Sequence, residues 1–228
     1  MPSLVGSEMC IRDSYNWIQD NIKKVDKATN GKVGYIYIPD MGPEGLNEFS
    51  RYFYPQLDKE GLIIDDRANG GGNVSPMILE RLSREPYRLT MRRGSSLIGT
   101  VPDAVQVGPK VCLINKYSAS DGDLFPWGFR ALSLGKLIGT RTWGGIIGIS
   151  GPLPYMDGTD IRVPFFTSYD PKTGNWIIEN HGVDPDILID NDPIKEWNGE
   201  DQQLDRAIEE VMKQLKERKP LAPVPAPR

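Results

Sequence analysis

Short apolar runs alternate with helical patterns along most of the chain. Runs rich in β-branched and aromatic residues lie at residues 33–39, 62–65, 111–115, 136–142, 161–166 and 176–179. This composition is typical of strands, because such side chains pack well on a pleated, half-buried surface. Strand runs that alternate with helical segments predict an α/β domain, expected to occupy residues 30–190.

Apolar residues at helical spacing separate these runs. Residues 17–25 predict a short helix that ends at Asn30-Gly31, and residues 46–53 predict a second helix that Pro55 limits. A third pattern covers residues 124–131. In the last one, Leu204, Ala207, Ile208, Val211, Met212 and Leu215 form the clearest amphipathic helix of the chain. Residues 220–228 are rich in proline and predict an extended tail.

The first fourteen residues share no periodicity with the segments that follow. They read MPSLVGSEMCIRDS, and Leu4 to Asp13 is similar to what one reading frame of a common transposase sequencing adapter encodes. The apolar content is too sparse for the continuous core of a secretory signal peptide. We therefore expect residues 1–14 to be a non-native segment that makes few contacts with the core, and the chain to lack its native upstream part.

Composition narrows the class of protein. The 228 residues are 39% hydrophobic and 25% charged, which is the balance of a globular protein with one or two domains. The net charge is −4 and the basic residues form no cluster along the sequence, so we expect no nucleic-acid partner. No apolar run approaches the length of a membrane span. The two cysteines, Cys10 and Cys112, favour a reducing, cytoplasmic compartment. The single histidine, His181, argues against a His-rich metal site, and we expect no cofactor.

Candidate chemistry lies where strands are expected to end. Ser120 follows the strand at residues 111–115 and precedes a helical pattern, as a nucleophile on a tight turn would. At that position the Asp121 N–H has no acceptor within the helix. The glycine triplet 70–72, after the strand at residues 62–65, can bring a second unhindered N–H alongside. These parts match an oxyanion site for acyl chemistry.

Each feature also has a structural interpretation. Ser120 with Asp123 forms a variant of the capping box, and local sequence alone favours a helix cap over a nucleophile. A glycine triplet after a strand is more often a turn, and this one lacks the lysine of a phosphate-binding loop. Asp65 and Asp66 stand next to Arg67, which favours an ion pair over a metal site.

Several segments in order resemble the carboxyl-terminal catalytic region of tricorn protease and its bacterial homologues. They are GKVGYIYIPDMGPEGLNEFSRYFYPQ, LIIDDRANGGG, NKYSASDGDLF, IGTRTWGG, ENHGVDPDI and DQQLDRAIEEVMKQL. The resemblance covers nearly all of residues 15–228. It implies an α/β fold of the Clp-protease and crotonase type, with a C-terminal amphipathic helix. It also implies a tail-specific-protease-type catalytic domain at residues 15–219 and a Pro-rich tail at residues 220–228.

The same resemblance implies roles for individual residues. Ser120 matches the nucleophile, and Asp121 matches the residue whose N–H serves the oxyanion hole. Gly71, or failing that its neighbour Gly72, matches the other donor. Glu179 matches the acidic member of the tricorn catalytic set.

The base distinguishes two branches of this family. The related processing proteases carry a lysine 25 residues after the nucleophile, whereas this chain has Gly145 there. That difference favours the tricorn-like branch, in which a histidine deprotonates the serine. The family histidine lies upstream of the segment present here. His181 would share a strand face with Glu179 and is the alternative base, although nothing in the sequence places it near Ser120.

Three functions follow. The first is a serine peptidase that hydrolyses peptides or oligopeptides through a Ser120 acyl-enzyme, here as a fragment without its histidine, from a homo-oligomeric full-length protein. The second is a noncatalytic binding or assembly module with the same fold. The third is a crotonase-like enzyme acting on acyl thioesters, which would use the oxyanion site without a serine nucleophile.

Overall fold

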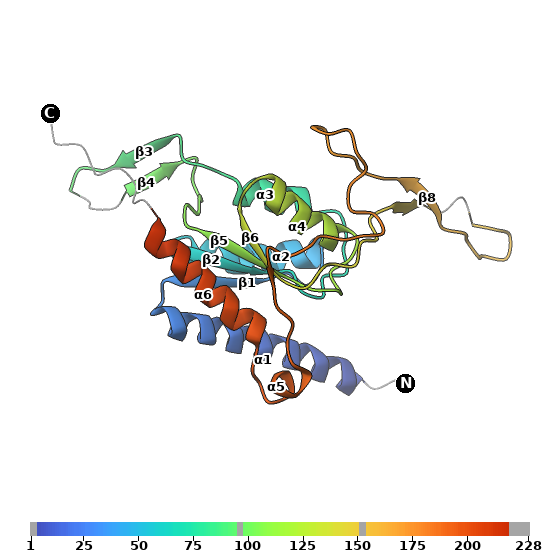
Figure 1. Cartoon of the computed structure of the whole chain (residues 1–228), viewed down its shortest axis with the longest axis horizontal. Helices are drawn as coiled ribbons and strands as arrows, with labels where there is room; N and C mark the ends of the chain where they lie inside the picture. The colour runs from blue at the N-terminus through green and yellow to red at the C-terminus, as the bar shows by residue number, and fades with distance from the viewer. Residues whose placement is uncertain (1–3, 95–97, 151–153, 219–228) are drawn as a thin grey trace.

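A parallel sheet forms the centre of the molecule in the computed structural model, which describes residues 4–94, 98–150 and 154–218 (Figure 1). Its strand order is β1-β2-β5-β6-β9, and every neighbouring pair is parallel. The strands are β1 (Val33–Tyr37), β2 (Gly61–Asp65), β5 (Lys110–Ile114), β6 (Gly135–Gly139) and β9 (Ile187–Leu188). All strands therefore end at one edge of the sheet, where loops from distant parts of the sequence meet.

Helices cover both faces of this sheet (Figure 1). One face carries α1 (Leu4–Thr29) and α6 (Gln202–Glu217), and the other carries α2 (Pro43–Phe53), α3 (Ser75–Leu82) and α4 (Asp121–Ala131). A short helix η1 (Tyr54–Gln56) follows α2, and α5 (Pro193–Trp197) precedes α6. This arrangement confirms the predicted α/β class with a C-terminal amphipathic helix.

Two hydrophobic clusters lie on opposite sides of the sheet because successive strand side chains point to opposite faces. On β2, Ile63 packs toward α1 and α6, whereas Leu62 and Ile64 pack toward the other three helices. Every residue of β2 and of β5 is buried. These are the continuous apolar runs expected of strands covered on both faces.

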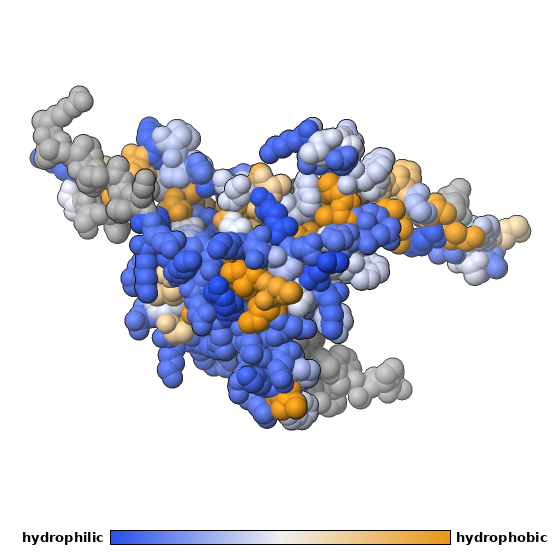
Figure 2. All heavy atoms as spheres, in the orientation of Figure 1, coloured by the Kyte–Doolittle hydropathy of each residue, from blue (hydrophilic) through white to orange (hydrophobic). Residues whose placement is uncertain are grey.

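Two antiparallel hairpins extend away from the sheet (Figure 1). One pairs β3 (Arg88–Met91) with β4 (Ile98–Val101), and the other pairs β7 (Gly148–Ser150) with β8 (Val163–Phe166). Every residue of β8 is exposed, and Phe165 keeps 76% of its surface. Figure 2 shows orange, hydrophobic residues along this projecting hairpin.

The strand prediction for residues 176–179 is wrong. Trp176 forms only an isolated bridge with Tyr169, and Glu179 lies in a turn. The backbone turns sharply here, with φ of 24° at Ile178, 59° at Asn180 and 82° at Gly182. Such dihedral angles cannot continue a strand, even though the local composition favours one.

The first helix also differs from its prediction. It ends at Thr29 as expected but begins at Leu4, well before Trp17. Residues 1–3 and the side chains before Asp13 lie outside the described part, as does the tail from residue 219 onward. The non-native origin of residues 1–14 therefore stays a prediction. None of the described helices combines the length and apolar character of a membrane span.

Candidate active site

Ser120 occupies a strained backbone position at the start of α4. Its φ of 56° and ψ of −119° lie in a region that residues with a side chain rarely adopt, at a cost of about 1–3 kcal/mol. Ser120 precedes the helix, yet its hydroxyl makes no capping hydrogen bond. The capping interpretation is therefore wrong for this side chain, which leaves the half-buried hydroxyl free for another role.

The turn before Ser120 is tied to the loop that follows β2. The buried Ser118 hydroxyl donates to the Asp66 carbonyl at 2.8 Å, and the Ala119 N–H donates to the Asn69 carbonyl at 2.8 Å. The Asn69 side chain in turn donates to the Ile38 carbonyl and to Asp66. These bonds hold the two loops at a fixed separation, which explains how the strained turn persists.

Gly71 lies directly against Ser120, as the sequence predicts. A Cβ on Gly71 would be 2.6 Å from the Ser120 Cβ and 3.0 Å from the Asp121 nitrogen. With φ of 95°, Gly71 also adopts a conformation that disfavours side chains. Its N–H donates to Asn69 Oδ1 at 2.9 Å. Gly72 has φ of 151° and approaches the Met41 carbonyl instead of Ser120.

Asp121 fixes the beginning of α4 through its side chain. The buried carboxylate accepts hydrogen bonds from the Ser75 N–H, at 2.9 Å, and from the Ser75 hydroxyl. Because Asp121 is the first residue of α4, its own N–H has no acceptor within the helix. The amide close to Gly71 therefore stands at the positive end of the helix dipole.

Two further carboxyl groups are buried around this turn. Asp66 and Asp123 have no exposed surface, and each has one oxygen, Oδ2, without a hydrogen-bond partner in the described part of the chain. Burial raises the pKa of Asp66 well above its usual value, and the neighbouring Asp65 charge adds to the rise. Burial likewise raises the pKa of Asp123, against hydrogen bonds that lower it.

Glu179 is held by the loop at residues 142–147. Its Oε2 accepts from the Ile146 N–H at 2.7 Å and from the Ile147 N–H at 3.0 Å. The same loop contacts the nucleophile turn, because the Gly144 N–H donates to Asp123 Oδ1 at 2.7 Å. The structure thus connects Glu179 to the Ser120 region through backbone amides.

The sequence pattern does not predict this connecting role of the loop at residues 142–147 and of Asp123. In the loop, the Trp143 N–H also donates to the Ser118 carbonyl at 3.0 Å. The glycine pair Gly144-Gly145 is the one available signal, since a Cβ on Gly144 would overlap the backbone at His181 and Gly182.

His181 is paired with Asp184 and not with Ser120. Its exposed ring lies with Nε2 at 2.9 Å from Asp184 Oδ2, and Asp184 also accepts from Arg141. Hydrogen bonds from His181 and Arg141 lower the pKa of Asp184. The expected strand face shared with Glu179 does not exist, because both residues lie in a turn. Among the described residues, no cluster of histidine, cysteine and acidic side chains could hold a metal ion.

Comparisons with known proteins identify the family of the chain. The model of peptidase family S41 matches residues 32–189. Tricorn protease of Thermoplasma volcanium is 43% identical over 203 residues, which are 89% of this chain and 20% of that protein. Tricorn protease homolog 1 of Streptomyces coelicolor is 36% identical over 88% of this chain and 19% of its own length. The chain thus spans about a fifth of the length of these relatives.

Solved structures share the fold. The crystal structure of the tricorn protease matches 88% of this chain and 19% of its own, with a TM-score of 0.82 and 40% identity. The photosystem II D1 C-terminal processing protease matches 69% of this chain and 42% of its own at 21% identity, with a TM-score of 0.51, which concerns the fold alone. The chain therefore belongs to peptidase family S41.

Proposed function

We propose that this chain carries the nucleophile and the oxyanion hole of a serine peptidase that hydrolyses peptides or oligopeptides. The observation that carries the proposal is the Ser120 turn. There, a serine with a strained backbone, whose hydroxyl makes no capping hydrogen bond, lies against Gly71 and the Asp121 amide. A helix-capping serine does not require a positive φ, and a simple turn does not require a glycine beside the serine Cβ. A nucleophile held on a strained turn beside two N–H donors accounts for both features.

In the proposed reaction the Ser120 oxygen attacks the carbonyl carbon of the scissile peptide bond. The hydroxyl proton passes to a general base, and the negative charge on the carbonyl oxygen is held by the Gly71 and Asp121 N–H groups. Breaking the C–N bond releases the amine, which takes up the proton from the base. Water then hydrolyses the Ser120 ester and returns the free hydroxyl.

The Gly71 N–H must be available for this step. It donates to Asn69 Oδ1, a side-chain oxygen that a substrate oxygen would replace or share. A developing oxyanion is a stronger acceptor than an amide oxygen, because hydrogen bonds to charged groups are roughly twice as strong as neutral ones. We infer that Asn69 holds the amide in place until substrate arrives.

We propose that the general base is a histidine outside this chain. His181 is the one histidine in the sequence, and its ring is paired with Asp184. Resemblance to the tricorn enzymes supports an upstream histidine as the base that deprotonates Ser120. Glu179 then acts as a positioning residue, with Oε2 held by the Ile146 and Ile147 amides and Oε1 left to orient the base or the substrate.

The cellular context is proposed on the same resemblance. We propose that the full-length protein acts in the cytoplasm as a homo-oligomer. The projecting β7–β8 hairpin supports an assembly, because it exposes large hydrophobic side chains, with Phe165 at 76% and Met156 fully exposed (Figure 2). Contiguous exposed apolar surface of this kind is typical of protein interfaces.

Fluorophosphonate labelling tests the proposed function. The chain alone should label slowly, because an unassisted serine is a weak nucleophile, and adding the upstream region of the same protein should restore labelling and peptide cleavage. Removing a triad-type base costs about 10⁴-fold in rate, so the expected gain is large. Ser120→Ala should abolish both activities. Cleavage without labelling at Ser120 would overturn the assignment of the nucleophile, and no gain of either activity with the upstream region would favour a binding module.

A further inference from the structure

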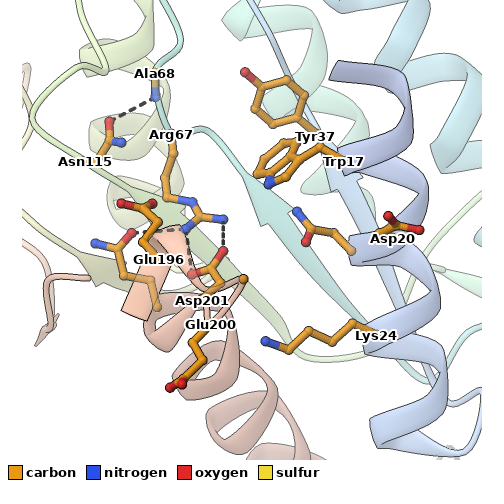
Figure 3. Close-up of a pocket in the computed structure, with 13 residues that line it drawn as sticks. Trp17, Asp20, Lys24, Tyr37, Arg67, Ala68, Asn115, Glu196, Glu200 and Asp201 are labelled. Carbon is orange, nitrogen blue, oxygen red and sulfur yellow. Dashed lines mark hydrogen bonds and ion pairs between the residues drawn. The ribbon is translucent and has the colours of Figure 1, made fainter. Parts of the chain in front are cut away.

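A cavity lies at the edge of the sheet where the parallel strands end, on the face covered by α1 and α6. It has a volume of about 450 Å³ and lies between α1, the end of β1 and the segment that joins α5 to α6. Figure 3 shows Trp17, Asp20 and Lys24 on the α1 side and Glu196, Glu200 and Asp201 on the opposite side. We call this cavity the Trp17 pocket.

Arg67, at the back of the Trp17 pocket, has no free N–H donor for an anionic ligand. The buried Arg67 guanidinium donates from Nε and Nη2 to Asp65, and from Nη1 and Nη2 to Asp201. The Gln203 side-chain oxygen accepts the remaining donor at 3.1 Å. These bonds use all five N–H groups of the arginine, so its charge is neutralised and its donors are occupied.

The side chains of the pocket that remain without an ion-pair partner are acidic. Lys24 is paired with Asp205 at 2.7 Å. The exposed Glu200 carboxylate has no ion-pair partner within the described residues, and Glu196 contacts only the Asn191 amide, at 3.2 Å. A cationic group therefore fits this end of the pocket.

The aromatic wall adds a second requirement. Trp17 is 41% exposed and meets Tyr37 edge to face, with ring centroids 5.1 Å apart. An exposed tryptophan ring and a half-buried tyrosine ring next to carboxylates favour an extended segment that combines prolines with a basic side chain. Such segments form polyproline II helices that pack on aromatic grooves, and their cations stack on the rings.

The chain itself carries a segment of this chemistry. Residues 218–228 read RKPLAPVPAPR, with three basic residues, four prolines and no acid. We propose that this tail docks in the Trp17 pocket of the same molecule, with Pro227 against Trp17 and Tyr37 and Arg228 beside Glu200. The Trp17 pocket lies apart from the peptidase chemistry of Ser120, which is not among its lining residues.

The tail is long enough to return to the pocket. It leaves from the end of α6, whereas the pocket lies at the beginning of that helix, beside Asp201 and Gln203. The 16 residues of α6 are about 24 Å long at 1.5 Å per residue. The ten residues that follow Arg218 span about 31 Å as polyproline II, so the last residues reach the pocket. Tethering gives an effective concentration of about 1 mM or more, so a weak contact is sufficient.

Nuclear relaxation of the full chain tests this docking. The amides of Ala222, Val224 and Ala226 should have order parameters near those of rigid backbone, about 0.8, and Glu200→Lys should lower them below about 0.6. Arg228→Glu should have the same effect and should shift the Trp17 indole N–H resonance. High salt should weaken the docking, because the charges at the mouth of the pocket are exposed to solvent.

A matched control separates docking from a general effect of charge. Glu209→Lys introduces the same change at an exposed site of α6 outside the pocket and should leave the tail amides ordered. Tail amides that are mobile in the native chain, or that respond equally to both substitutions, would overturn the proposal. Ordering that appears only when the protein concentration is raised tenfold would also overturn it, because the tail would then bind a second copy.

Discussion

The two sides of Ser120 are built differently. On one side, the loop from Asp65 to Gly71 is mostly buried, follows a central strand and is fixed by hydrogen bonds from the Ser118 and Asn69 side chains. On the other side, Glu179 and His181 lie in a turn. Glu179 is half-buried and accepts hydrogen bonds from backbone amides, whereas His181 is exposed and pairs with the exposed carboxylate of Asp184. The Gly71 side of Ser120 is therefore fixed by buried hydrogen bonds, whereas the turn that carries Glu179 and His181 makes no hydrogen bond to the Ser120 side chain among the described residues.

This contrast has a physical basis. An oxyanion hole must hold its donors at fixed positions before charge develops, so it benefits from buried backbone with little freedom. Residues that handle protons must exchange them with substrate and solvent, so they lie nearer the surface.

Gly71→Ala should have the largest effect. The added Cβ would lie 2.6 Å from the Ser120 Cβ at a backbone φ of 95°, so either the loop or the serine must move. We expect the rate of Ser120 labelling, measured with the upstream region present, to fall about 10²–10³-fold, as for the loss of one oxyanion donor. Gly70→Ala is the matched control, since a Cβ there meets nothing within 4 Å. Equal losses for both variants would contradict the proposed contact.

Glu179→Gln should have a smaller effect. Glutamine keeps an oxygen that can accept from the Ile146 and Ile147 amides, but it removes the charge. Hydrogen bonds to charged groups exceed neutral ones by about 1 kcal/mol, so we expect about a fivefold lower kcat/KM with an unchanged fold. Glu179→Ala should cost more, because both amides lose their acceptor. A normal rate in Glu179→Gln would show that the charge has no part in the reaction.

The sequence predicts the rigid side of the site better than the other side, because the rigid side is attached to regular strands. The predicted runs at residues 33–39, 62–65 and 111–115 overlap β1, β2 and β5, and parallel strands end at one edge. That geometry alone brings Gly71 and Ser120 together.

Glu179 could not be located in this way. Its position depends on the loop at residues 142–147, whose amides bond to Asp123 and Glu179 across 21 and 33 residues. Such contacts leave no periodic pattern in the sequence. The composition of residues 176–179 favours a strand, and only the tertiary contacts of the turn override it.

Asp66→Asn should change the pH dependence of stability. Burial raises the folded-state pKa of Asp66 above its unfolded value, so the folded state retains a proton that the unfolded state loses. The free energy of unfolding therefore falls as pH rises from the unfolded pKa through the folded one. An asparagine side chain cannot ionise, so the variant lacks this loss of stability. The free energy of unfolding of the variant minus that of the native protein should therefore be larger at pH 7–8 than at pH 3, by about 1.4 kcal/mol for each unit of the pKa shift that is removed. Urea unfolding across this range would reveal it, and parallel curves for both proteins would contradict it.

His181→Ala should have the smallest effect of these changes. The ring is exposed and contacts only Asp184, and exposed ion pairs contribute about 0–1 kcal/mol. Arg141 continues to hold Asp184 after the substitution, so its carboxylate keeps a partner. We expect an unchanged melting temperature within about 2 °C and unchanged Ser120 labelling with the upstream region present. If the 228-residue chain alone cleaves peptides readily and His181→Ala eliminates that cleavage, then His181 is the base, and the proton-transfer side of the site is complete within this chain.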